Sequence, residues 1–501
     1  MFAALIGFSY LGSGACGNPK ATDVRAPSVA GRFYPAEPEK LRQAIQLFLK
    51  DSVRMPIETP VALIVPHAGY IYAGQIYADA YRQVMGRHYD VVAILGVNHT
   101  APGFSGVSLG PYSAYRTPLG DIPVDEEITS RLLSKCRDCN RDRQAQAAEH
   151  SIEVQVPFIQ VLFPNAKIVP AILHPPDMGM CTRFGQSLAK VLKNRQALIV
   201  ISSDLSHYPD SDNAAKADRE TLDGIATLDP SKIVSLMHTL NFPNLDTRAC
   251  GEASILAGLT AAKALGATQA IAAGYANSGD VAVGDRSRAV GYGAMVLAAG
   301  STATGIQSLD RPAPPSRFTP LQGGEKRELL KLARGTIQRY LDTQTVPLAR
   351  NFPARLNYRQ GAFVTLKKNG QLRGCIGHIP PDTELCKAVS AAALLSAFED
   401  TRFLPVQANE LGSIEIEISA LTPLKPIGSA DEIVVGRDGV LIIKEGASAI
   451  FLPQVAPENN WGRDEMLENL CRKGGWPAGC WKQDAKLQVF QADVFNESQF
   501  R

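Results

Sequence analysis

The sequence predicts an α/β protein in which a mostly parallel sheet flanked by helices is followed by a C-terminal α+β domain. Three observations lead to this prediction. Between residues 26 and 300, short apolar β-rich runs alternate with longer amphipathic segments, as in βαβ units. Residues 301–323 lose all periodicity and are rich in Ser, Thr, Pro and Gly, which indicates a linker. Residues 324–501 begin with a long helical segment and continue with short strands.

The first domain contains several apolar runs typical of buried strands. They are residues 61–66, 90–98, 167–173, 197–203, 270–276 and 289–297. Helical periodicity, often after a capping residue or with an acidic first turn, predicts helices between them. These are residues 39–51, 126–135, 150–163, 181–193, 215–226 and 250–265. In the second domain we expect helices at residues 324–343 and 383–398, and strands at residues 362–367, 413–420 and 448–452.

The composition is that of a folded protein with balanced charges. The 501 residues include 51 Lys and Arg against 49 Asp and Glu, so no excess positive charge favours nucleic acid as a partner. Residues 1–25 are predicted to be a leader or a disordered tail, because an apolar run ends in small residues and Cys16, as in a lipoprotein signal. We expect a cytoplasmic protein, with an exported lipoprotein anchored to the membrane through Cys16 as the alternative.

The nine cysteines are scattered along the chain, which favours a reducing compartment over a disulfide scaffold. Cys136 and Cys139 form a CxxC sequence between two polar segments. We interpret them as an exposed pair of thiols, with a disulfide or a metal site as the alternatives.

Metal-ligating residue types follow two of the predicted strands. Ligands bind at the carboxyl ends of strands in open α/β sheets, and His67 and His99 lie at two such ends, in "VALIVPHAG" and "VVAILGVNH". Gly69 is expected to let the backbone approach the site closely. Cys250 precedes a helical run whose dipole is expected to lower its pKa, although an inert buried thiol is the alternative. Two imidazoles and a thiolate can hold Fe(II), Cu or Zn and leave one position open.

Two further pairs are candidates for catalytic acid–base groups. Asp204 and His207 follow a strand in "SSDLSH", and His150 and Glu153 lie in "EHSIEVQ". Residues three apart lie on one side of a helical turn, so each pair can support a metal or move a proton. As alternatives, Asp204 could cap the following turn, and the other pair could line a solvated helix face.

Five motifs occur in the order "PHAGYIYAG", "GVNH", "EHSIEVQVPF", "SSDLSHY" and "CGEASI". Over residues 26–299 they closely resemble the Memo family, which is itself similar to class III extradiol ring-cleavage dioxygenases. The resemblance implies that His67, His99 and Cys250 are metal ligands, and that Asp204 and His207 line the same site.

Those dioxygenases hold a non-haem iron with two histidines and a carboxylate, so Cys250 departs from their pattern and puts ring cleavage itself in doubt. Glu252 could supply a carboxylate instead. The resemblance implies a metal-dependent redox or oxygenase-like protein acting on an unknown small molecule, with Fe(II) favoured over Cu and Zn. The alternatives are a peptide- or protein-binding module with a vestigial or structural metal, and a Zn-type hydrolase.

Residues 324–501 are similar to the AMMECR family through "LRGCIGHI", "AFEDTRF", "LPQVAPENNW" and "LCRKGGWPAGCW". Cys375 lies between two glycines, and Arg373 beside it could contact an anion or stabilise a thiolate. His378 is the only base that we can assign to a Cys375 nucleophile, and a structural cysteine is the favoured alternative. Asp400 and Arg402 are expected to pair with each other or to face a shared cleft.

A chain that carries both domains resembles a fusion of the A and B components of the AmmeMemoRadiSam system of bacteria and archaea. This resemblance implies a radical-SAM protein as a partner. The chain itself has no CxxxCxxC sequence, so any radical chemistry would take place on that partner.

Overall fold

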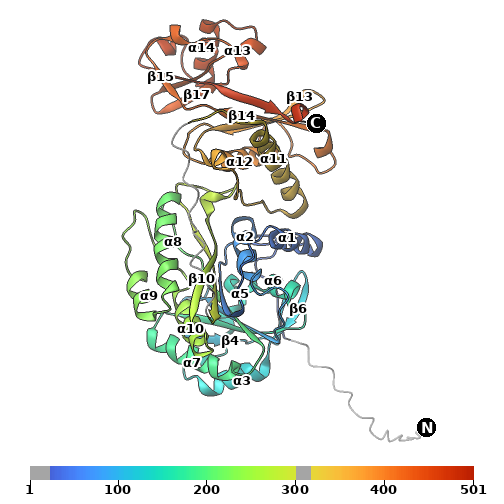
Figure 1. Cartoon of the computed structure of the whole chain (residues 1–501), viewed down its shortest axis with the longest axis vertical. Helices are drawn as coiled ribbons and strands as arrows, with labels where there is room; N and C mark the ends of the chain where they lie inside the picture. The colour runs from blue at the N-terminus through green and yellow to red at the C-terminus, as the bar shows by residue number, and fades with distance from the viewer. Residues whose placement is uncertain (1–22, 301–317, 501) are drawn as a thin grey trace, which may run out of the picture.

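The computed structural model describes residues 23–300 and 318–500, which form two parts joined end to end (Figure 1). The first part, blue to green in Figure 1, contains an eight-stranded sheet, and the second, orange to red, contains two four-stranded sheets. This confirms the predicted fold class. Cys16 and most of the predicted leader and linker lie outside the described residues. No helix in the described ranges is both long and apolar enough to cross a bilayer.

The large sheet is parallel in its centre, which antiparallel pairs join to β11 on one side and to β4 on the other. Its order is β10-β11-β2-β9-β3-β8-β4-β7, and the four adjacent strands β2, β9, β3 and β8 run parallel. The strands are β2 (Thr59–Val65), β3 (Val91–Val97), β4 (Gly106–Leu109), β7 (Cys139–Asn140), β8 (Lys167–His174), β9 (Ala197–Ser202), β10 (Gln269–Asn277) and β11 (Gly291–Ala299). A smaller sheet contains β1 (Val24–Arg25), β5 (Ala114–Thr117) and β6 (Gly120–Pro123).

Helices cover both faces of the large sheet, which is why its central strands are apolar runs without alternation. Leu63 and Val65 pack towards one layer, and Ala62 and Ile64 towards the other. The first layer contains α1 (Pro38–Lys50), α2 (Tyr70–Tyr81), α4 (Arg143–Ala147), α5 (His150–Glu153) and α6 (Val156–Leu162). The second contains α3 (Glu126–Lys135), α7 (Met178–Leu192), α8 (Ser211–Ala226), α9 (Pro230–Met237) and α10 (Glu252–Ala264).

The predicted helix over residues 150–163 is wrong in one respect, since the segment forms two helices, α5 and α6. Pro157 lies in the first turn of α6, where a missing N–H is tolerated, and it could not continue a helix from α5. No helix was predicted at α2, where ten of the twelve residues are buried and Tyr and Gly lower the helix propensity. Gly74 lies inside α2, where a Cβ would come within 2.4 Å of the Phe48 ring on α1.

The prediction of exposed thiols at Cys136 and Cys139 is wrong. The two residues form a disulfide, and Cys136 is buried. The chain turns directly after α3 and places the two Cα atoms 5.3 Å apart, within reach of a disulfide. A second disulfide joins Cys471 to Cys480.

The second part consists of two antiparallel sheets. α11 (Gly323–Thr343) and α12 (Leu385–Phe398) share a core with the sheet β13-β12-β14-β19, whose strands are β12 (Ala362–Lys368), β13 (Gln371–His378), β14 (Ile414–Leu421) and β19 (Ala492–Asn496). The sheet β15-β18-β16-β17 lies beside α13 (Val455–Glu458) and α14 (Arg463–Lys473), and its strands are β15 (Lys425–Ile427), β16 (Gly439–Lys444), β17 (Ala447–Phe451) and β18 (Lys486–Phe490). Leu421 and Phe490 belong to the apolar cluster that joins the two sheets.

The two parts meet beside α1 and α2 (Figure 1). Val281 of the first part packs with Val346 and Leu394 of the second. Asp79 on α2 is completely buried, and its carboxylate pairs with the guanidinium of Arg350 at 2.6 Å. A buried carboxylate needs such a partner, so this ion pair helps to set how the two parts join, as does the pair of Lys387 and Asp280 at 2.9 Å.

Arg350→Ala is therefore expected to lower the free energy of unfolding by about 3 kcal/mol, because it leaves the Asp79 carboxylate buried without its cation. Urea unfolding measures this change. As a control, Arg131→Ala removes an exposed pair with Glu127 and is expected to cost less than about 0.5 kcal/mol. Equal effects of the two substitutions would contradict this account of the interface.

Candidate metal centre

Three histidines converge at the carboxyl ends of the parallel strands. His67 follows β2, His99 follows β3 and His150 is the first residue of α5. One ring nitrogen of each lies within 4.8 Å of the others, so the three could hold a metal ion. The His67 side chain is 2 % exposed, whereas those of His99 and His150 are 30 % and 19 % exposed. The group is thus anchored in the interior and reachable from solvent on one side.

Cys250 joins this group from the loop before α10. Its Sγ lies 3.1 Å from Nε2 of His67. A Cβ on the next residue, Gly251, would come within 2.5 Å of Cβ of Ser203, so only glycine lets this loop approach the end of β9 so closely. The expectation for Gly69 is not met, since it precedes α2 and a Cβ there would make ordinary contacts at 3.4 Å.

Hydrogen bonds determine which nitrogen of His67 carries the proton. The hydroxyl of Ser202 donates its one hydrogen to the carbonyl of Ser151 at 2.6 Å. It can therefore only accept at its 3.1 Å contact with Nδ1 of His67, so Nδ1 holds the proton. The lone pair of Nε2 then faces Cys250, which is the arrangement that a metal ligand requires.

Glu149 fixes the second histidine, and the sequence analysis did not single it out. Its carboxylate accepts from the backbone N–H of His99 at 2.6 Å and contacts Nδ1 of the same residue at 3.0 Å. It also contacts Nδ1 of His150 at 3.3 Å. Burial disfavours its charge, but the hydrogen bond and charges of the two histidines outweigh burial and hold its pKa at about 2. Glu149 precedes α5 and accepts from Ser151 N–H, so in the sequence it looks like an ordinary helix cap.

The protonation of the three rings differs with their surroundings. Burial lowers the pKa of His67, and the charges of the neighbouring histidines lower it further. Burial also lowers the pKa of His150 to about 4. Burial opposes the charge on His99, but Glu149 outweighs it and raises the pKa. His67 and His150 are therefore neutral at neutral pH, the form that binds a metal.

Asp204 contacts His67, and the charges of His207 and the neighbouring histidines influence one another. Oδ1 of Asp204 accepts from the backbone N–H of His67 at 2.7 Å, so this carboxylate holds the end of β2 rather than capping its own turn. Burial raises the pKa of Asp204 to about 6. Nε2 of His207 is buried and has no hydrogen-bond partner among the described residues. Burial and the charge of His99 lower the pKa of His207.

Glu153 has a different place from the one predicted. Its carboxylate accepts from Arg25 at 2.7 Å, from Tyr34 Oη at 2.7 Å, and from the backbone N–H groups of Ser28 and Val29. Both oxygens are thus engaged in holding the segment before α1. The side chain is 1 % exposed, so the solvated-face alternative is wrong as well.

Two expectations for the start of α10 also differ from the structure. Burial raises the pKa of Cys250, so the helix end does not make it a free thiolate. Glu252 lies 3.8 Å from Nε2 of His238 and is not one of the residues in the histidine group. The Cys250 thiol is therefore protonated unless a metal displaces the proton.

Residues 25–296, more than half of the chain, match the family model described as Memo-like protein. The chain belongs to the Memo-like protein family. Residues 330–495 match the family model AMMECR1, so the two parts are called the Memo domain and the AMMECR1 domain below.

Curated relatives named MEMO1 family protein correspond to the Memo domain. MEMO1 family proteins of Methanopyrus kandleri and Methanocaldococcus jannaschii are 35 % and 37 % identical to the chain. Each match covers 55 % of this chain and 99 % of the relative. A solved structure of an uncharacterized protein from Pyrococcus horikoshii is 36 % identical, covering 35 % of this chain and 93 % of its own, with a TM-score of 0.34.

In the AMMECR1 domain, Cys375 and His378 are not brought together. His378 contacts Asp382 at 2.5 Å, and residues three apart in a strand point to opposite faces. The thiol of Cys375 instead accepts a hydrogen bond from Thr365 at 3.3 Å. Gly374 has a packing role, because a Cβ there would come within 2.2 Å of a carbonyl of α12. These contacts support the structural alternative for Cys375.

Asp400 and Arg402 pair with each other and close the free edge of β13. Asp400 accepts a hydrogen bond from the backbone N–H of Cys375 at 2.8 Å, and Arg402 donates one to the backbone carbonyl of Cys375 at 3.1 Å. An edge strand whose backbone groups are satisfied in this way is protected from pairing with another chain. Arg373 is paired with Glu410 at 2.6 Å.

Glu149→Gln is expected to weaken metal binding about 10–100-fold, because it removes the charge that orients His99 and His150. Competition with a chromophoric chelator measures the affinity. Glu252→Gln is the matched control, since this carboxylate faces His238, and it should leave the affinity unchanged. If both variants bind metal as wild type does, Glu149 does not support the centre.

Asp400→Asn is expected to lower stability in a pH-dependent manner. The hydrogen bonds of Arg402 hold the pKa of Asp400 at about 2, below that of an unfolded Asp, so the stabilisation is present above about pH 4 and is lost as the pH falls towards 2. Because Arg402 is half exposed, we expect a loss of only about 1–2 kcal/mol at pH 7. Urea unfolding at pH 7, 4 and 3 should show that the loss of stability becomes smaller as the pH falls. Arg402→Gln, which removes the other partner of the pair, should show the same trend. A constant loss would refute the pairing argument.

Proposed function

We propose that the Memo domain is a metal-dependent redox enzyme that acts on a small molecule, with Fe(II) favoured over Cu and Zn. One observation carries the proposal: three histidine nitrogens lie within 4.8 Å of one another, and a cysteine Sγ lies 3.1 Å from one of these rings. Nitrogen and sulfur donors suit these three metals and exclude Mg and Ca.

The residues fit such a metal. His67 and His99 each engage Nδ1 in a hydrogen bond, so both can present Nε2 to the same ion. For the third ligand, family resemblance favours Cys250, whose Sγ lies beside His67. The closeness of its ring nitrogen to those of His67 and His99 favours His150 instead. When bound, the metal would supply Lewis acidity or electron transfer.

The neighbouring groups can move protons on a bound substrate. With a pKa of about 6, Asp204 can hold or release a proton near neutral pH, and its Oδ2 lies 3.9 Å from Nε2 of His67. Nε2 of His207, which has no hydrogen-bond partner within the described ranges, can accept a proton or a hydrogen bond. Because His99 and His150 remain partly exposed, a small molecule can reach this side of the group. A purely structural metal site would need no such groups, which favours an enzyme over a binding module.

The partner and the compartment are further parts of the proposal. Family resemblance supports a radical-SAM protein as the partner. The two disulfides support an oxidising compartment and so favour export, with lipidation of Cys16, over a cytoplasmic location.

Protein purified without oxygen is expected to contain close to one iron or copper per chain, measured by elemental mass spectrometry. His67→Ala and His99→Ala should each remove it, and Cys250→Ser compared with His150→Ala identifies the third ligand. Oxygen uptake with candidate substrates should then depend on Asp204 and His207. If wild type holds no metal, or if the His67 and His99 variants hold as much as wild type, the enzyme proposal fails and the binding-module alternative gains support.

A further inference from the structure

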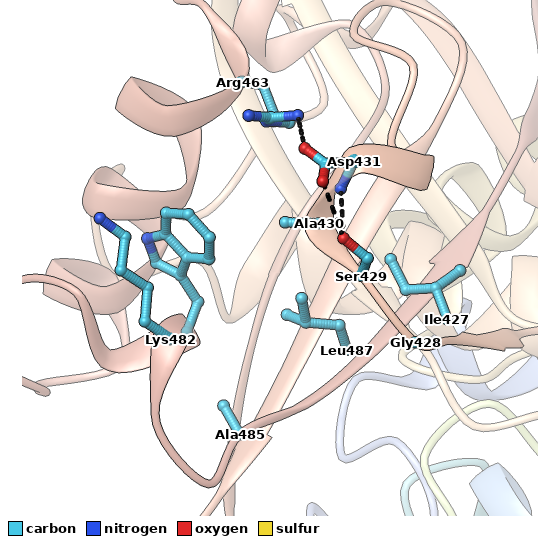
Figure 2. A pocket seen from close by; sticks show the side chains of 10 residues that line it. Ile427, Gly428, Ser429, Ala430, Asp431, Arg463, Lys482, Ala485 and Leu487 are labelled. Atoms are coloured by element: carbon cyan, nitrogen blue, oxygen red, sulfur yellow. Dashed lines mark hydrogen bonds and ion pairs between the residues drawn. The ribbon is translucent and has the colours of Figure 1, made fainter.

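The AMMECR1 domain contains a pocket of about 340 Å³ that is separate from the metal centre (Figure 2). It lies where β15 and β18 meet the start of α14 and the short 3-10 helix η5 (Cys480–Lys482). The residues that line it are Ile427, Gly428, Ser429, Ala430, Asp431, Arg463, Trp481, Lys482, Ala485 and Leu487.

Part of the pocket wall is apolar and flat. Ile427 and Leu487 pair across β15 and β18, and Trp481 adds an indole ring. Nε1 of Trp481 is buried and has no hydrogen-bond partner in residues 23–300 or 318–500. Because this atom is shielded from solvent, Trp481 contributes its apolar ring to the wall and not its N–H.

The charges in the pocket leave one cation without a counter-ion. Arg463 is paired with Asp431 at 2.5 Å and with Asp464 at 2.9 Å. Lys482 makes no ion pair within the described part of the chain, and its Nζ lies 4.8 Å from the centre of the Trp481 ring. Figure 2 shows Lys482 on one side of the pocket and the pair of Arg463 and Asp431 on the other. Because Arg463 is held between two carboxylates, Lys482 is the cation of the lining that has no counter-ion among the described residues, and such a cation suits an anion.

The second disulfide holds these groups in place. Cys471 lies near the end of α14, and Cys480 directly precedes Trp481 and Lys482. The disulfide therefore ties the aromatic and cationic wall to the helix that begins with Arg463. A turn at Gly479, with φ of 74°, leads into this wall, and its N–H donates to Glu468 at 2.8 Å. A site held in advance in this way loses less entropy when it binds a ligand.

We propose that this pocket binds a small organic carboxylate with a planar apolar body. The body lies against Trp481, Ile427 and Leu487, and the carboxylate accepts from the ammonium of Lys482. Nothing in this proposal depends on the metal centre of the Memo domain.

The test uses the full chain and two probes of the same shape, 4-fluorobenzoate and its neutral counterpart 4-fluorobenzamide. Titrations followed by ¹⁹F NMR measure both affinities. We expect the carboxylate to bind at least about tenfold more tightly than the amide, because it makes a charge-assisted hydrogen bond. Lys482→Gln should abolish this preference and leave the amide unchanged. Lys486→Gln, an exposed lysine of β18 outside the lining, is the matched control and should behave as wild type.

Two further variants locate the site. Trp481→Ala removes the ring of the wall, so it should weaken binding of both probes several-fold, while Trp476→Ala, outside the lining, should not. His99→Ala should leave binding unchanged, which separates this pocket from the metal centre and from the fate of the proposed redox function. Equal affinity for the two probes, no binding of either, or a preference that survives Lys482→Gln would overturn the proposal.

Discussion

The hydrogen bond from Ser202 to the carbonyl of Ser151 is the constraint on which the proposed centre depends. It uses the only hydrogen of the hydroxyl, so His67 must donate through Nδ1 and present the lone pair of Nε2. This hydrogen bond joins the end of β9 to α5, and Glu149, which precedes α5, holds His99 in the same manner. Residues at one short helix therefore fix the proton on Nδ1 of both His67 and His99, which follow two separate strands. Without this arrangement, the rings would meet but would not offer their lone pairs to one ion.

The approach of Cys250 depends on packing rather than on hydrogen bonds. Its loop reaches His67 only because Gly251 has no side chain to collide with Ser203. The burial that results raises the pKa of the thiol, so metal binding has to displace a proton there. The same burial lowers the pKa of His67, which favours the neutral ligand. Burial thus keeps the imidazole of His67 in the neutral form that binds a metal. It also keeps the thiol of Cys250 protonated, so a metal has to displace that proton before the sulfur can bind it.

The long central strands could be predicted from the sequence because both of their faces are buried and they form continuous apolar runs. α2 was missed because burial leaves it without a polar face and because, unlike the Ala-rich α10, it is rich in Tyr and contains Gly, which are weaker helix formers. Among the site residues, His67, His99 and Asp204 were found from their position at strand ends. Glu149 was missed because a carboxylate before a helix normally caps it. Glu153 was misplaced because its partners Arg25 and Tyr34 lie more than a hundred residues away, and no local pattern reveals such contacts.

The most direct measurement is X-ray absorption spectroscopy of the full chain loaded with one equivalent of Zn²⁺. If His67 and His99 present their lone pairs beside Cys250, the spectrum should contain nitrogen scatterers at about 2.0 Å and one sulfur at about 2.3 Å. The His99→Ala variant should lose imidazole scattering. A shell of oxygen atoms alone would contradict the account, because it would mean that the metal binds carboxylates and water away from the three histidines.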